Sequence, residues 1–386
     1  MRVGAGISAE HDPLSAGVAA ARHAAEQLGS VPVDLVLVFA SGGHLAAPEA
    51  TLEGVGSVLE PAVLVGCGAG GVIGGGRELE EGSAVAVWAG SFGGTGSATP
   101  FHATLADDGV EQALEGLPEL GDSSGMLMLS DPYSFPTDAA LTLLCDAAPG
   151  VPILGGISSG RTPDGQGAVF CGDEVHETGA VGVRLDGIEM LACVSQGAAP
   201  LGREVTITAG EGNVINELAG RPALETVEQI IGELSVRERT LIAGGLLIGI
   251  VIDGGKPDYQ QGDFLVRGVL GADPDSGSIA VSASVRPGQV LRLHARDAQS
   301  ADEDFRRALQ LHVQALGDRP PAGAIVFSCN GRGSSMFGIP DHDAAAVQSE
   351  LRGAPAAGFF AAGEIGPVGG RSFLHGFTAT VAVFPN

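Results

Sequence analysis

The sequence has few basic residues, and nearly all of them are arginine. Twenty lysine and arginine residues stand against 46 aspartate and glutamate residues, which gives a formal net charge of −26, and Lys256 is the only lysine. A negative field of this size repels nucleic-acid backbones and anionic membrane surfaces, so it argues against both as general partners. It does not exclude a small acid, because an acidic protein can hold a local basic pocket.

Long apolar runs and paired cysteines are also missing. The longest apolar stretch, around Ala243–Ile252, is too short and too rich in glycine to span a bilayer, and the N-terminus lacks a signal-peptide pattern. The five cysteines include no CxxC pair, and the nine histidines form no HExxH pattern. We therefore expect a cytoplasmic protein without disulfide framework, metal or cofactor.

Short apolar runs bounded by glycine, aspartate or serine predict buried strands. These runs lie at residues 34–40, 126–130, 245–252 and 324–328. Stretches with alanine, acidic starts or cap residues predict helices at residues 13–28, 138–147, 222–234, 301–316 and 341–351.

One arrangement of elements recurs along the chain. After three of the strands comes a helical stretch, then a second apolar strand, then a turn of small residues and a further strand. The three turns lie at residues 61–70, 151–160 and 355–363. The spacing of the first two strands fits a βαβ crossover, so we predict a β-α-β-turn-β unit used at least three times. Shared small residues alone are the alternative explanation.

The predicted fold class is mixed α/β (α+β), with two related domains of stacked mixed sheets and helices packed outside. A stretch rich in Gly, Ala and Pro near Ala198–Gly202 predicts the boundary, so the domains are expected at residues 1–198 and 199–386. Asp273–Gly277 is typical of a hairpin turn between two strands.

The glycine-rich segment Gly66–Gly76 invites comparison with a dinucleotide-binding loop. Its spacing lacks the third glycine of GxGxxG, no amphipathic helix follows, and no Lys-Ser/Thr pair makes it a P-loop. Turn packing explains the glycines, and close approach of the backbone to a ligand is the functional alternative, with Arg77 and Glu78 at its rim.

Short sequence blocks that resemble those of a known family follow one another in a fixed order over nearly the whole chain. The strand at residues 34–41 with Val65–Glu78 resembles the N-terminal FIST domain, and the second half resembles the FIST C domain. The C-terminal blocks are Pro200–Gly202, Asn216–Leu218, Pro222–Leu224, Gly262–Arg267, Arg296–Ala298, Phe327–Gly333, Met336–Gly338, Gly363–Pro367 and Leu374–Thr378.

The resemblance implies a two-part sensory module of bacterial signal-transduction proteins, related to the FIST part of certain F-box proteins. It also implies a small ligand, with an amino acid as the usual suggestion, and carries no established reaction. The 386 residues hold no kinase, cyclase, methyl-accepting or F-box segment, so a sensor of this kind is expected to signal through a partner protein.

The segment Ser328–Gly333 is a candidate ligand site, because a strand ends there in a turn with Cys329, Asn330 and Arg332 between glycines. Arg332 can clamp a carboxylate bidentately, and its alternative is an ion pair with a nearby acid. A free cysteine such as Cys329 is more often a small buried residue than a reactive one.

Four further residues belong to the candidate ligand-binding set. Glu364 follows a buried strand and needs either a ligand ammonium or a salt bridge to Arg371 or Arg332. His375 precedes the last strand, as an acid–base group or as a structural histidine. Arg296 can point into a cleft, whereas its neighbour Asp297 is expected to cap the following helix.

Three functions remain open on this basis. A sensor predicts a preformed pocket and no turnover, and a protein-binding scaffold predicts an exposed apolar patch. An enzyme would use Cys329 as nucleophile with His375 or Glu364 as base. We rank them in the order sensor, scaffold, enzyme.

Overall fold

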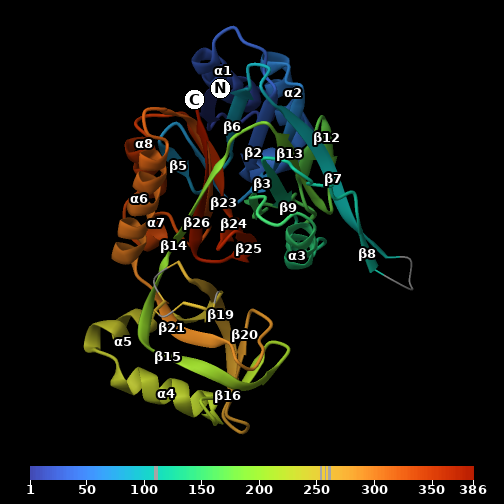
Figure 1. Ribbon diagram of the computed structural model, residues 1–386. Helices are drawn as coiled ribbons and strands as arrows, with labels where there is room; N and C mark the ends of the chain where they lie inside the picture. The colour runs from blue at the N-terminus through green and yellow to red at the C-terminus, as the bar shows by residue number, and fades with distance from the viewer. Residues whose placement is uncertain (108–111, 253, 257, 260–261) are drawn as a thin grey trace. The chain divides into compact units, whose positions relative to one another are not determined.

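The computed structural model describes residues 1–107, 112–252, 254–256, 258–259 and 262–386 (Figure 1). Its contacts divide the chain into two compact units. Unit 1 comprises Met1–Val194, Phe305–Leu374 and Ala379–Asn386, and unit 2 comprises Ser195–Asp304 with His375–Thr378. The fold is mixed α+β, as the sequence predicts, with helices and strands in four sheets.

Unit 1 contains three sheets that share one strand order. The first runs β1 (Arg2–Ser8), β6 (Ala84–Ser91), β2 (Leu35–Ser41), β3 (Val63–Ala69), β11 (Val169–Cys171) and β12 (Glu174–His176). The second runs β8 (Gln112–Glu115), β7 (Ser97–Asp107), β13 (Ala180–Asp186), β9 (Gly125–Ser130), β10 (Ile153–Ile157), β24 (Glu364–Val368) and β25 (Arg371–His375). The third runs β14 (Leu191–Gln196), β26 (Thr378–Pro385), β22 (Pro321–Cys329), β23 (Ala356–Ala361), β4 (Val72–Gly74) and β5 (Arg77–Leu79).

The repeated unit predicted from the sequence is confirmed at the centre of each sheet. The parallel pairs are β2 with β3, β9 with β10 and β22 with β23. Each pair is joined through a helix, α2 (Pro48–Leu59), α3 (Thr137–Ala147) or α8 (His342–Glu350). In every case an antiparallel strand (β6, β13 or β26) pairs with the first strand. The repeated structure is therefore a sheet, and all three copies lie within unit 1.

The three repeats exchange their hairpins in a cycle. The hairpin β4–β5 of the first repeat pairs with β23 of the third, and β11–β12 of the second pairs with β3 of the first. The hairpin β24–β25 of the third pairs with β10 of the second. The turns before two of the hairpins also bond to strands of other repeats, since Phe360 N in β23 donates to Gly71 O and Ile157 N in β10 donates to Gly363 O. No sheet of unit 1 is thus built from one repeat alone.

A glycine lies at the same place in the second strand of all three repeats. Gly66, Gly155 and Gly358 pair with Val38, Met128 and Val326 in register. A Cβ at these glycines would lie 2.0, 1.8 and 1.8 Å from the carbonyl oxygen of the respective partner. Since that oxygen belongs to a buried backbone, the strands can approach this closely only with glycine at the three positions.

We expect Gly66→Ala and Gly358→Ala each to lower the free energy of unfolding by at least about 2 kcal/mol, because the added methyl group must displace a strand. Urea denaturation measures the change. The control is Gly56→Ala in α2, where a Cβ meets nothing within 4 Å and where alanine is expected to stabilise by about 0.5–1 kcal/mol. Equal effects at the three positions would contradict the expectation.

The core of unit 1 lies where the inner faces of the three sheets meet. It contains Phe39, Phe359 and Phe327, with ring centroids 4.9 Å apart for the first pair and 5.9 Å for the second. Helices cover the outer faces, as predicted. Helices α1 (Pro13–Leu28) and α2 cover the first sheet, α3 covers the second, and α8 with the later part of α6 (Ala298–Ala315) covers the third (Figure 1).

Unit 2 is built on one antiparallel sheet that closes on itself. The order is β15 (Ala198–Glu211), β21 (Val290–Arg296), β18 (Leu246–Val251), β19 (Phe264–Asp273), β20 (Ser278–Val281), β16 (Val214–Leu218) and β17 (Arg221–Pro222), and β16 also pairs with β15. Helix α4 (Ala223–Glu233) packs its apolar face on the core of this sheet, and α5 (Val236–Ile242) follows it. The predicted hairpin at Asp273–Gly277 is confirmed, since Gly277 N donates to Asp273 O over 2.8 Å.

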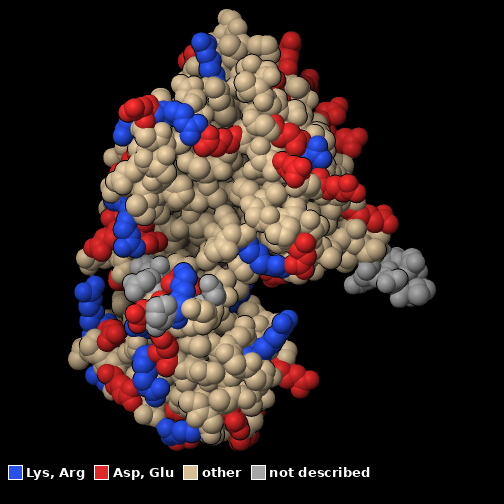
Figure 2. All heavy atoms as spheres, in the orientation of Figure 1, with Lys and Arg blue, Asp and Glu red and all other residues tan. Residues whose placement is uncertain are grey.

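The acidic side chains do not gather in one patch on the face shown in Figure 2. Red groups are scattered between wide neutral areas, and blue groups lie among them. On this face the negative charge is therefore not concentrated in one patch.

Candidate functional site

The candidate site begins where the parallel strands of the third repeat end. Strand β22 ends at Cys329, a tight turn follows, and the single-turn helix α7 (Ser334–Phe337) leads on to α8. The turn is held by Arg332 N, which donates to Cys329 O over 2.8 Å, and by Asn330 N, which donates to Ala361 O over 2.9 Å. The carboxyl ends of parallel strands are common places for ligand sites.

A buried ion pair occupies the centre of this turn. Arg332 is 1% exposed and Asp343, on the first turn of α8, is fully buried. Nε of Arg332 donates to Oδ2 of Asp343 over 2.7 Å, and Nη2 donates to Oδ1 over 2.9 Å. Ser328 Oγ donates to Oδ2 over 2.7 Å, and His342 Nδ1 lies 2.9 Å from Oδ1. Arg332 therefore forms the ion pair that the sequence analysis gave as the alternative to ligand binding, and its partner is Asp343.

Charge stabilisation outweighs burial in this pair. Burial favours neutral Arg332, but the Asp343 carboxylate raises the pKa of the guanidinium above its ordinary value. Burial likewise favours neutral Asp343, but Arg332 and hydrogen bonds from His342 and Ser328 hold the pKa of that carboxyl well below its usual range. Both side chains are therefore charged at neutral pH.

The guanidinium of Arg332 also lies between aromatic rings and keeps one nitrogen unused. Its central carbon is 5.3 Å from the ring centroid of Phe305 and 5.1 Å from that of Phe337, and Phe337 stacks on His342 with centroids 3.4 Å apart. Nη1 is buried and makes no hydrogen bond to any residue that the structure describes. A buried donor without an acceptor is costly, so this atom marks a place for an additional partner.

The exchanged hairpin brings a further carboxylate to the start of α8. Glu78 of β5 is 7% exposed, and its Oε1 accepts a hydrogen bond of 2.9 Å from Ala344 N. Burial, together with the nearby charges of Asp343 and Glu80, raises the pKa of Glu78 to about 7, although the bond from Ala344 opposes the shift. The sequence placed Glu78 at the rim of a glycine-rich turn but gave no sign of this contact.

The other predicted residues of unit 1 fall into two groups. Cys329 and Glu364 are buried and interact electrostatically with Arg332, which raises the pKa of the guanidinium further. Asn330 is exposed on the same turn. Arg371 lies apart in an exposed ion pair, with Nη1 2.6 Å from Oδ1 of Asp146. The structure thus brings together Cys329, Arg332 and Glu364.

Two predicted residues belong to unit 2. The guanidinium of Arg296 lies 4.3 Å from the ring centroid of Phe377, and His375 is 3% exposed. Asp297 precedes α6, and its backbone oxygen accepts a 2.9 Å hydrogen bond from Ala301 N, which agrees with the expected cap.

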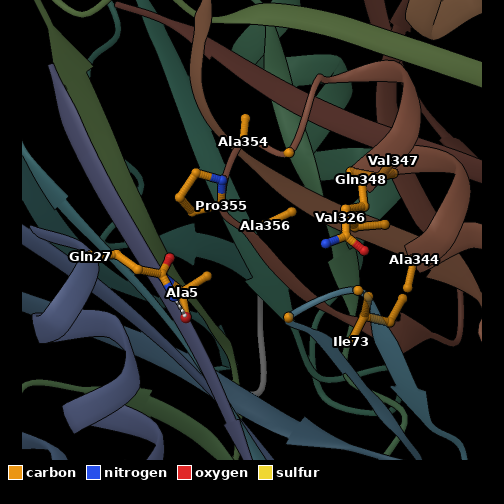
Figure 3. Close-up of a pocket in the computed structure, with 13 residues that line it drawn as sticks. Ala5, Gln27, Ile73, Val326, Ala344, Val347, Gln348, Ala354, Pro355 and Ala356 are labelled. Atoms are coloured by element: carbon orange, nitrogen blue, oxygen red, sulfur yellow. Dashed lines mark hydrogen bonds between the residues drawn. The ribbon is translucent and has the colours of Figure 1, made fainter.

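A separate pocket in unit 1 is bordered by α8 (Figure 3). It has a volume of about 280 Å³ and is lined by Ala5, Gln27, Ile73, Gly75, Gly76, Val326, Ala344, Val347, Gln348, Gly353, Ala354, Pro355 and Ala356. Gly75 and Gly76 belong to the glycine-rich segment for which the sequence left close approach to a ligand open.

Comparison with known proteins gives the family. A model of the FIST N domain matches residues 34–221, and a model of the FIST C domain matches residues 223–367. An uncharacterized protein of Mycobacterium tuberculosis strain H37Rv is 41% identical over 385 residues, which cover 100% of both chains. The chain belongs to the FIST family. An uncharacterized protein of Mycobacterium bovis is 39% identical over 385 residues, covering 100% of this chain and 99% of the relative.

FIST domains are sensory signal-transduction modules, and here the two matches share unit 1. The FIST N match contains the first two repeats, and the FIST C match contains β22, β23 and α8 of the third. Both matches also enter unit 2. The division of this FIST protein at residues 198 and 199 stays a prediction, because the family matches and the compact units divide the chain in different ways.

Other features of this FIST protein concern groups that could carry chemistry. Within the described residues, no cluster of three or more His, Cys, Asp or Glu side chains is arranged to hold a metal ion. None of the five cysteines forms a disulfide within the described residues. No helix in the described part of the chain is long and apolar enough to cross a membrane.

Proposed function

We propose that this FIST protein is a sensor for an amino acid or a similar small acid, bound at the strand ends of the third repeat in unit 1. The ligand carboxylate would accept a hydrogen bond from Arg332 Nη1. Glu364 would receive the ligand ammonium, and Asn330 would add an amide contact from the rim of the turn. In this proposal the protein acts in the cytoplasm and passes the signal to a partner protein.

The observation that carries the proposal is the unused Nη1 of a fully buried arginine. Asp343 takes Nε and Nη2, so it fixes the guanidinium plane and leaves one edge for a second acceptor. An acidic ligand there would satisfy a buried donor, and its charge would offset the buried charge of Arg332. Glu364 lies within electrostatic reach of the same guanidinium, as a zwitterion requires.

The remaining predicted contacts stay predictions. Arg371 already pairs with Asp146, and Arg296 and His375 belong to unit 2. Cys329 is 7% exposed, which fits a packing role beside the ligand as well as it fits the nucleophile of the enzyme hypothesis.

A thermal-shift screen against amino acids, carboxylic acids and nucleotides tests the proposal. A ligand at a hundred times its dissociation constant is expected to stabilise the fold by about 2.7 kcal/mol. The shift should disappear in Arg332→Lys, which cannot present a planar second edge, and should weaken in Asn330→Ala, which leaves the ion pair intact.

Arg371→Ala is the matched control, because it removes an exposed arginine of the same unit and should keep the shift. A shift that survives Arg332→Lys would place the ligand elsewhere. If no compound produces a shift, the sensor proposal fails and the protein-binding scaffold takes its place.

A further inference from the structure

The pocket beside α8 is distinguished by the kind of groups that line it. No Asp, Glu, Lys, Arg or His side chain is among its lining residues. In a protein with a formal net charge of −26, this wall offers a charged ligand no counter-ion. Placing a charge there would therefore be costly, whereas an uncharged polar molecule needs only hydrogen bonds.

The polar groups in the pocket are amides. The side chain of Gln27 bridges Ala5 of the edge strand β1: Nε2 donates to Ala5 O over 2.8 Å, and Oε1 accepts from Ala5 N over 3.2 Å. This leaves Gln27 one N–H and one oxygen lone pair. Figure 3 shows the carboxamides of Gln27 and Gln348 on opposite sides of the pocket, with Pro355 and Ala356 between them.

The backbone adds amide groups of the same kind. The ladder between β4 and β23 ends at the pair Gly74 and Ala357, so Ala356 lies one residue beyond the last paired position. Gly75 and Gly76 turn the chain with φ values of 56° and 73°, and a Cβ at Gly76 would lie 2.1 Å from Gln348 Oε1. Strand edges and a side-chain-free turn thus border the same cavity.

We propose that this pocket binds a small uncharged planar molecule that carries an amide or cyclic ureide group. Such a group pairs a donor with an adjacent acceptor, as Gln27 already does with Ala5. The apolar side chains of Ile73, Val326 and Val347 give a planar ring a surface to pack on. The volume of about 280 Å³ is near the lower end of ligand pockets, which suits a single ring. The site is separate from the proposed acid site at Arg332.

The experiment compares uncharged molecules with charged counterparts by calorimetry: nicotinamide against its isostere nicotinate, and uracil against orotate, which is uracil with an added carboxylate group. The uncharged member of at least one pair is expected to bind at least tenfold more tightly than its acid. Ala354→Phe fills the pocket and should abolish binding. Ala345→Phe, on an exposed position of α8, is the matched control and should preserve it.

Gln348→Glu is a second variant that does not depend on repacking, since Gln348 is exposed. It replaces an amide by a carboxylate and should weaken binding of the amide at least fivefold. The proposal is overturned if the acids bind as well as the amides, if Ala354→Phe and Gln348→Glu both leave binding intact, or if neither nicotinamide nor uracil binds up to about 10 mM.

Discussion

Arg332→Met is expected to lower the free energy of unfolding by about 3–5 kcal/mol, because it leaves the Asp343 carboxylate buried without its counter-ion. Asp343 is fully buried, and two of its four hydrogen bonds come from Arg332. The remaining bonds come from the uncharged hydroxyl of Ser328 and from His342. Urea denaturation at pH 7 measures the loss.

A double mutant shows whether the loss comes from the stranded carboxylate. Arg332→Met with Asp343→Leu replaces both charges by apolar groups and should recover most of the stability. Arg371→Ala breaks an exposed ion pair with Asp146 and is expected to cost no more than about 1 kcal/mol. A double mutant as unstable as the single one would mean that the pair is not the source of the effect.

Glu78→Gln is expected to stabilise the protein at pH 8 by about 2–3 kcal/mol and to have little effect below pH 4.5. Burial raises the pKa of Glu78 from 4.5 to about 7, so the folded state keeps a proton that the unfolded state has already lost. The stability of the wild-type protein should therefore fall as the pH rises from 4.5 to about 7. Glutamine carries no charge and still accepts the bond from Ala344 N.

The acidic groups around Glu78 act in the same direction as burial, since they also raise its pKa. Asp343 and Glu80 are the acidic neighbours that raise its pKa, and Asp341 accepts a 2.6 Å hydrogen bond from the backbone N of Glu78. Denaturation curves between pH 4 and pH 8 for the wild type and Glu78→Gln give the test. Glu53→Gln, on an exposed part of α2, should leave the profile unchanged. Parallel profiles for the wild type and Glu78→Gln would refute the expectation.

The sequence predicted the local elements and the repeat, because both depend on short patterns. Helix α1 begins at Pro13 as expected, with Asp12 Oδ2 accepting from Ser15 N over 2.9 Å. The three parallel pairs follow from strand, helix and small-residue turn in order. The hairpin exchange could not be predicted, because β4 and β24 are only three and five residues long and pair with strands from other repeats.

The sequence analysis found part of the candidate site for a similar reason. Arg332 and Cys329 stand out where a strand ends, and Glu364 follows a buried strand. The sequence analysis did not single out Asp343, the partner of Arg332, which lies within the helix predicted at residues 341–351. Nothing in the sequence marks Gln27 or Gln348 as pocket residues, because a glutamine beside a pocket has no sequence pattern that distinguishes it from any other exposed glutamine on a helix.

The cyclic hairpin exchange sets the order in which a nascent chain can mature. While the ribosome is still making residues 195–304, β4 and β5 have already emerged, but β23, their partner strand, has not been synthesised. Strand β10 likewise has no partner on one edge until β24 has been synthesised. The first two repeats must therefore persist with unmatched strand edges until the last part of the chain arrives, and such edges invite contact with other chains. Unit 1 can therefore be completed only after the C-terminal strands have been synthesised, however early its first strands form.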